Sequence, residues 1–152
     1  CTIKMDIMDM EQNATNIEYI YSKTNNDILH MVVRYENINT PREDIIPEEE
    51  FLQLAILKMP AGKTFRPHYH IPKLINYKEA IAQESWVIIK GSVEVYFYDT
   101  NNKLIHTTIL KQGDVSITLK GGHNFKILEK DTIVYEFKTG PYYGVELDKE
   151  FI

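Results

Sequence analysis

The sequence has few residues that build covalent cross-links. Its 152 residues include one cysteine, Cys1, so an intrachain disulfide is excluded. Metal ligands in such a chain have to come from histidine, aspartate and glutamate. Histidine is also scarce, because the chain has only five. A cluster of histidines is therefore the first feature to look for.

Long apolar runs and positive net charge are missing as well. No run reaches the ~18 apolar residues of a membrane-spanning helix, so no membrane partner is expected. The net charge of −5 argues against a nucleic-acid partner, which basic proteins bind through phosphates. The first residues lack the charged and then apolar pattern of a secretory leader, so a cytoplasmic location is expected. With 43% hydrophobic and 26% charged residues, the composition is that of a globular protein.

Residues that favour β-strands are abundant. Ten tyrosines and many isoleucines, valines and threonines lie between closely spaced turn signals. This pattern predicts an all-β domain, a sandwich or barrel. The predicted strands are residues 17–22, 29–35, 51–59, 64–70, 84–89, 93–98, 104–110, 115–119, 123–128 and 132–137.

Three segments between these strands have patterns of their own. Residues 99–103, DTNNK, predict a hairpin turn, because Asn and Asp tolerate positive φ. Residues 41–50 have acids near a possible helix start and are either irregular or hold one helical turn. Residues 73–83 fit either a short helix or a long loop.

Two of the five histidines lie in one short stretch, PAGKTFRPHYH, at residues 60–70. In a strand over residues 64–70, side chains alternate, so Arg66, His68 and His70 share one face. Two imidazoles at this spacing can bind one metal ion. The alternative is an exposed strand with two solvated histidines.

Glu84 and His123 each begin a predicted strand. An acid at the start of the otherwise apolar stretch ESWVIIKG is costly to bury unless a metal or Arg66 pairs with it. The alternative is that Glu84 lies at an exposed strand end. His123 follows two glycines and is either directed to a site or a core histidine bonded to a backbone carbonyl.

In order, these pieces resemble the two motifs of the cupin superfamily. Gly62, five residues and His68-Tyr69-His70 match the opening of the first motif, and Glu84, six residues and Gly91 match its close. The second motif is matched more loosely. Its residues are Gly113, five residues and then Leu119-Lys120-Gly121-Gly122-His123.

The chain departs from the family pattern at three points. Thirteen residues separate His70 from Glu84, where the family has a much shorter spacing; this insert predicts a flap at the mouth of the site. Gln83 is a neighbouring alternative to Glu84, although it faces the other way in a regular strand. Leu119 replaces a proline, and Ile127 stands where asparagine is common.

The resemblance implies a double-stranded β-helix, the cupin or jelly-roll barrel of two antiparallel sheets. Residues 51–152 would form this barrel, and the strands and loop of residues 1–50 would extend a sheet of the same domain. It also implies one divalent transition metal, Fe, Mn, Ni, Co, Zn or Cu. The implied metal ligands are His68, His70, Glu84 and His123.

Three functions are compatible with such a site. The favoured one is a metal-dependent enzyme that isomerises, epimerises or oxygenates a small molecule. Arg66 and Glu84 are its candidate catalytic residues, since the guanidinium fork matches a carboxylate or phosphate. The alternative for Arg66 is a salt bridge to Glu84 or to a neighbouring acid. The other functions are non-catalytic ligand binding and a structural module with a vestigial site.

Two further expectations concern partners and substrate. Cupins commonly dimerise through extra strands, so a homodimer is expected. Residues 135–152, YEFKTGPYYGVELDKEFI, are similar to the tails of small bacterial cupins, some of which accompany sugar genes. That similarity points to carbohydrate metabolism.

Overall fold

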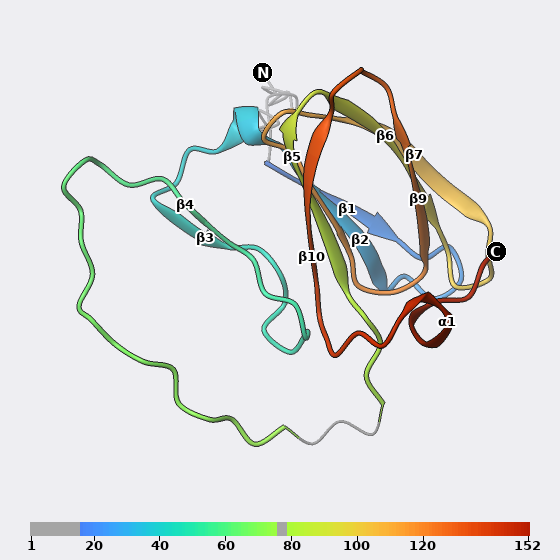
Figure 1. Ribbon diagram of the computed structural model, residues 1–152, viewed down its shortest axis with the longest axis horizontal. Coiled ribbons are helices and arrows are strands. Elements are labelled where there is room, and N and C mark those ends of the chain that lie inside the picture. Colours follow the sequence, from blue (N-terminus) through green and yellow to red (C-terminus); the bar gives the residue numbers. More distant parts are fainter. Residues whose placement is uncertain (1–15, 76–78) are drawn as a thin grey trace, which may run out of the picture.

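The computed structural model describes residues 16–75 and 79–152, and these residues form an all-β structure (Figure 1), as the sequence predicts. Helical structure in this part of the chain is confined to the 3-10 turn η1 (Tyr35–Asn37) and the one-turn helix α1 (Val145–Asp148). Neither has the length and apolar character that would let a helix cross a membrane. The strands are β1 (Ile17–Tyr21), β2 (Ile28–Val33), β3 (Arg42–Asp44), β4 (Ala55–Leu57), β5 (Glu84–Lys90), β6 (Ser92–Tyr98), β7 (Leu104–Lys111), β8 (Val115–Thr118), β9 (Gly122–Ile127) and β10 (Ile133–Lys138).

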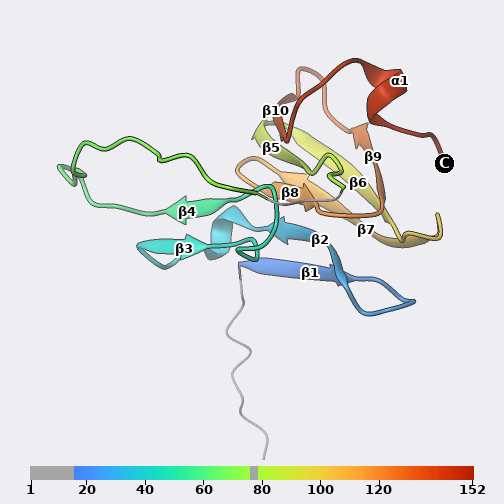
Figure 2. The same ribbon diagram turned by 90° about the horizontal axis from the view of Figure 1, so that it is seen from below.

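Two antiparallel sheets make the body of the molecule. A five-stranded sheet has the order β1-β2-β8-β5-β10, and a three-stranded sheet has the order β7-β6-β9. The hairpin of β3 and β4 forms a separate small sheet, which projects to one side (Figure 2). The strands β1 and β2, from the first 50 residues, join the larger sheet through the pairing of β2 with β8.

Apolar side chains of the two sheets pack against each other. On β6, Val93, Val95 and Phe97 are fully buried, and the residues between them are partly exposed. A strand is predicted over residues 93–98, and its alternation turns the tyrosines of β6 toward the other face. A second core lies on the other face of the larger sheet, where Ile45 and Ile46 cover β2 and β8. Strands β2 and β8 are therefore buried on both faces.

Tight turns carry the chain between neighbouring strands. The predicted hairpin at residues 99–103 is confirmed: the amide of Asp99 donates to the carbonyl of Lys103 at 2.8 Å, and Asn102 has a φ of 67°. Gly91 connects β5 in one sheet to β6 in the other with a φ of +84°. A side chain at Gly91 would collide with Thr132, so only glycine fits this turn.

The strand predicted over residues 64–70 is not formed. Residues 60–75 have no regular strand or helix in the structure, and every one of them is exposed. The physical reason is that a strand needs a neighbour to complete its hydrogen bonds, and no strand of residues 16–75 and 79–152 pairs with this segment. Pro60, Pro67 and Pro72 further reduce its backbone donors.

Two other local predictions were also wrong or only partly right. Residues 41–50 do not form a helical turn; they contain β3, because Arg42–Asp44 pairs with Ala55–Leu57. That pairing leaves only three residues of the strand predicted at 51–59. Residues 73–75 and 79–83 form a loop, which is one of the two alternatives, and residues 76–78 lie outside the described part.

Candidate functional site

A row of polar side chains crosses the five-stranded sheet. In register, His30 on β2 lies opposite Thr118 on β8, Thr118 opposite Glu84 on β5, and Glu84 opposite Lys138 on β10. Residues directly opposite each other in a sheet share a face. His30, Thr118, Glu84 and Lys138 therefore form one line, called here the polar row.

His123 reaches this row from the opposing sheet. Its Nε2 atom lies 3.2 Å from Oε1 of Glu84, and its Nδ1 atom lies 2.8 Å from Oγ1 of Thr118. The side chains of Glu84 and His123 are 13% and 23% exposed, so solvent still reaches the pair. Two of the predicted site residues, 39 positions apart in the sequence, are thus brought into contact.

The hydrogen bonds behind His123 have defined directions. His30 Nε2 lies 3.0 Å from the carbonyl oxygen of Tyr98, which only accepts, so this nitrogen carries a proton. Burial lowers the pKa of His30 to about 4, against the raising effect of this hydrogen bond, so the ring is neutral at pH 7. Its Nδ1 atom, 3.0 Å from Thr118 Oγ1, therefore accepts the hydroxyl proton.

This chain of donors fixes the ring of His123. Because the Thr118 hydroxyl donates its proton to His30, its oxygen accepts from Nδ1–H of His123. The other nitrogen, Nε2, then faces the Glu84 carboxylate in one of two states. It carries a second proton, as an imidazolium, or it presents a lone pair to a cation.

The charge on Glu84 is supported by its surroundings. Burial raises the pKa of this carboxyl group, but the hydrogen bond and charge of His123, with Lys149 and Lys138, outweigh burial and hold it below its ordinary value. Lys138 is itself held by Asp148 of α1, with Nζ 3.4 Å from Oδ2. The carboxylate is therefore ionised at neutral pH.

Aromatic rings border this polar cluster. Trp86 on β5 stacks on Phe125 of β9 with ring centroids 3.8 Å apart and an interplanar angle of 4°. The indole N–H donates to Glu136 at 3.0 Å. On the other side of Thr118, His30 stacks on Phe97 at 4.5 Å. These stacks join the two sheets on either side of the Glu84–His123 pair.

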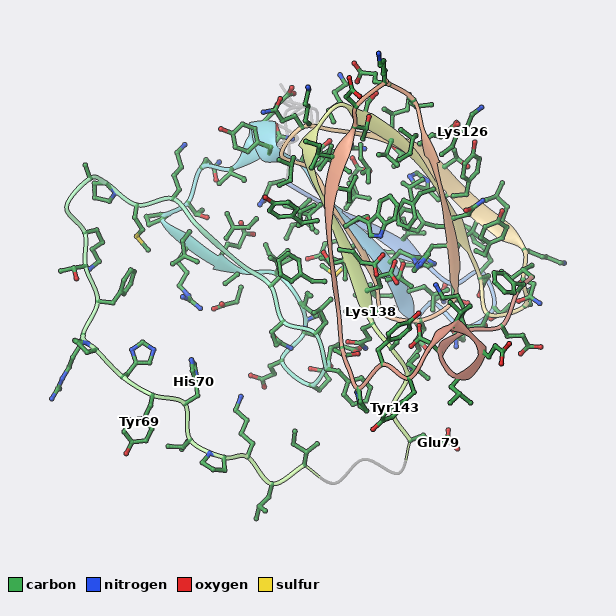
Figure 3. The ribbon with its side chains drawn as sticks, in the orientation of Figure 1. Tyr69, His70, Glu79, Lys126, Lys138 and Tyr143 are labelled. Carbon is green, nitrogen blue, oxygen red and sulfur yellow. The ribbon has the colours of Figure 1, made fainter. Side chains whose placement is uncertain are left out.

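The other three predicted site residues lie elsewhere. Arg66, His68 and His70 are on residues 60–75, a segment called here the arm, which runs well apart from the sheets (Figure 3). Within the arm, Nδ1 of His68 donates to the carbonyl of Arg66 at 2.9 Å, and Nε2 is the ring nitrogen outside this hydrogen bond. The His68 and His70 rings lie 5.5 Å apart.

The four residues implied as metal ligands are thus divided into two pairs. Across residues 16–75 and 79–152, no three or more His, Cys, Asp or Glu side chains come together in a way that could hold a metal ion. The donor types suit a transition metal, but the arrangement within one chain does not fit a four-ligand site. In each pair one histidine has its Nδ1–H held in a hydrogen bond, His68 on the arm and His123 on β9.

Gln83, the alternative to Glu84 as a site residue, holds neighbouring segments of the chain together. Its side-chain oxygen accepts from the amide of Leu52 at 2.8 Å, and its side-chain nitrogen donates to Glu50 at 2.6 Å. Gln83 is 1% exposed, so it anchors the chain where the loop enters β5. It has no contact with His123 in the described structure.

Sequence reasoning missed His30 and Thr118, which orient His123. His30 lies outside the motif residues, where the sequence pattern indicates only an ordinary strand residue. The available signal was its place in the apolar strand ILHMVV, since a buried histidine needs hydrogen-bond partners. Its partner was not identifiable, because Thr118 is 88 positions away.

Comparisons with protein-family models, with curated proteins and with solved structures found no match to this chain. Its function therefore has to be inferred from its residues and their geometry.

Proposed function

We propose that this chain is a metal-binding cupin-type protein, whose two sheets are the body of a double-stranded β-helix, and that it acts on a small molecule. The observation that carries the proposal is the state of His123. Its Nδ1–H is held by Thr118 while its Nε2 faces the ionised carboxylate of Glu84 at 3.2 Å. Metal-binding histidines are oriented by a hydrogen bond of this kind on the nitrogen away from the ion.

The donor types support a transition metal. Imidazole nitrogen and carboxylate oxygen suit Fe, Mn, Ni, Co, Zn or Cu. An ion held by His68, His70, Glu84 and His123 would supply Lewis acidity toward a substrate oxygen. His68 shares the tautomer of His123, with Nδ1–H bonded to a carbonyl and Nε2 available.

The chain's own residues would transfer a proton, bind the substrate and exclude water. The carboxylate of Glu84 would hold or move a proton at its Oε atoms, since it is ionised and partly open to solvent. The guanidinium of Arg66 would bind an anionic group of the substrate. The Trp86–Phe125 stack would keep water away from one side. An isomerase, epimerase or oxygenase acting on a sugar derivative or oxo-acid fits this set.

The test is metal analysis by plasma mass spectrometry on protein purified without added metal. We expect about one equivalent per chain in the wild type. His68→Ala/His70→Ala, Glu84→Gln and His123→Ala should each lose most of it. His106→Ala and Glu129→Gln are matched controls, because they remove a histidine and a glutamate outside the proposed ligand set.

Absence of metal from the wild type, even after incubation with each candidate ion, would contradict the proposal. His123 would then be the imidazolium partner of Glu84. Nitrogen-15 NMR of the histidine rings separates these states, because only the imidazolium carries protons on both nitrogens.

A further inference from the structure

The C-terminal residues cross the end of the molecule at which β9 meets the polar row. Residues 141–152, called here the strap, follow β10 and contain α1, which Figure 1 shows at this end of the sheets. The strap follows Lys138, which lies directly opposite Glu84 in the β10–β5 register. At its other end, Ile152 packs so close to Gly122 of β9 that a Cβ there would collide with its Cδ1 atom. The strap therefore runs from the five-stranded sheet to the three-stranded sheet.

One ion pair holds the middle of the strap. Nζ of Lys138 lies 3.4 Å from Oδ2 of Asp148 on α1, and their side chains are only 18% and 13% exposed. The same ammonium group lies over the ring of Tyr142, 3.9 Å from its centroid. Glu136 is 3.8 Å from this Nζ as well, but it belongs to β10 and does not hold the strap. Removing the charge of Asp148 would therefore release the strap from Lys138 while β10 keeps its own ion pair.

The next strap residue carries the opposite charge. Burial raises the pKa of Glu84, but His123 and the nearby charge of Lys149 outweigh burial and lower it. Lys149 directly follows Asp148, the partner of Lys138. Two neighbouring strap residues, one acidic and one basic, thus lie near a basic and an acidic residue that are paired across β10 and β5. This complementarity fixes where the strap lies on the sheets.

The apolar side chains of the strap add little to its attachment. Tyr143, Leu147 and Phe151 are 76%, 80% and 82% exposed, and α1 has no buried residue. A helix of one turn is also too short to be stable by itself. The position of the strap therefore depends mainly on charge, and a segment attached in this way opens more readily than the packed sheets.

We propose that the strap is a gate over the Glu84–His123 pair, closed by the ion pair of Asp148 with Lys138 and open when that ion pair breaks. With the strap in place, the side chains of Glu84 and His123 are 13% and 23% exposed. Opening moves Lys149 and the C-terminal residue away from the pair and uncovers it. That the gate admits a metal ion or substrate rests on the proposed function, whereas the gate itself rests on these contacts.

The test is the reaction of diethyl pyrocarbonate with the histidines of chelator-treated protein, followed for each residue by mass spectrometry. His70 on the exposed arm and the fully buried His30 are references within the same chain. In Asp148→Asn we expect His123 to react about fivefold faster, as for the loss of a weak ion pair, with His70 unchanged and His30 unreactive. Glu146→Gln is the matched control, because it removes the other acid of α1 and should leave all three rates unchanged.

Salt separates the charge of Asp148 from its shape. Because salt screens ion pairs, about 1 M NaCl should raise the rate at His123 in the wild type and leave Asp148→Asn unchanged. Equal rates at His123 in the wild type and Asp148→Asn overturn the gate. So does a rise at His30, because Asp148 would then stabilise the whole fold.

These outcomes do not depend on metal, so the gate and the proposed function can fail separately. A faster reaction in Asp148→Asn supports the gate even in a protein that binds no metal. Metal binding by a wild type whose His123 reacts at the rate of the variant overturns the gate alone.

Discussion

Replacing Thr118 by valine tests the network that orients His123. The hydroxyl group donates to Nδ1 of His30 and accepts from Nδ1 of His123, and Thr118 is 6% exposed. Valine keeps the shape of the side chain but removes both hydrogen bonds. His30 is fully buried, so no water replaces its lost donor.

The expected cost comes mainly from His30. An unsatisfied buried polar group costs about 1–3 kcal/mol, and the partly exposed His123 adds less because water reaches it. We therefore expect Thr118→Val to lower the free energy of unfolding by ~2 kcal/mol. Metal affinity should fall about 10- to 100-fold, because the ring of His123 loses its orienting acceptor.

Urea unfolding followed by circular dichroism measures the stability change, with the slope m expected to stay constant. Nitrogen-15 NMR reports which nitrogen of His123 carries the proton. Thr118→Ser keeps a hydroxyl and is the matched control, expected to retain most of the stability and the tautomer. A valine variant as stable as the wild type, with His123 still protonated at Nδ1, would refute the network.

Three further predictions concern His30, the glycine turns and the core. Folding lowers the pKa of His30 from 6.5 to about 4, because burial disfavours its charged form. The resulting stabilisation of about 3 kcal/mol in the free energy of unfolding is complete above pH 6.5 and is lost as the pH falls toward 4. Urea titrations at several pH values should show a smaller loss of stability in His30→Gln. Gly121→Ala should lower the melting temperature more than Gly62→Ala, although the two glycines have nearly the same φ, +82° and +81°. A Cβ at Gly121 collides with the Tyr98 carbonyl, whereas a Cβ at Gly62 meets open space. Equal melting temperatures of the two variants would contradict this. Phe97→Ala should cost about 3–5 kcal/mol in chemical unfolding, since Phe97 is fully buried between the sheets; a cost below 1 kcal/mol would mean that these sheets are not packed as described.

The predictable part of the fold is the part set by local pattern. Strands β5 to β10 follow alternation and turn residues that lie within a few positions of each other. Asp99 to Lys103 is one such turn, read from its own residues. Residues 64–70 have an equally good alternation, yet they form no strand in this chain. A strand also requires a neighbouring strand to pair with, and the local sequence does not identify that neighbour.

The candidate site divides in the same way. The sequence pointed to Glu84 and His123 through their positions at strand starts, and the structure puts them in contact. It gave no means of finding Thr118 as the link between His123 and His30. Those residues meet because β2, β8 and β5 are neighbours in one sheet while β9 comes from the other.

The sequence by itself determined the all-β class, the dependence of any metal site on His, Asp and Glu, and the alternation that buries Val93, Val95 and Phe97. These follow from composition and from a period of two residues, which are properties of the chain alone. Only the tertiary structure decided that Glu84 meets His123 while the arm with His68 and His70 lies apart. Strand order and register bring distant residues together, and they depend on the packing of the whole chain rather than on any one segment.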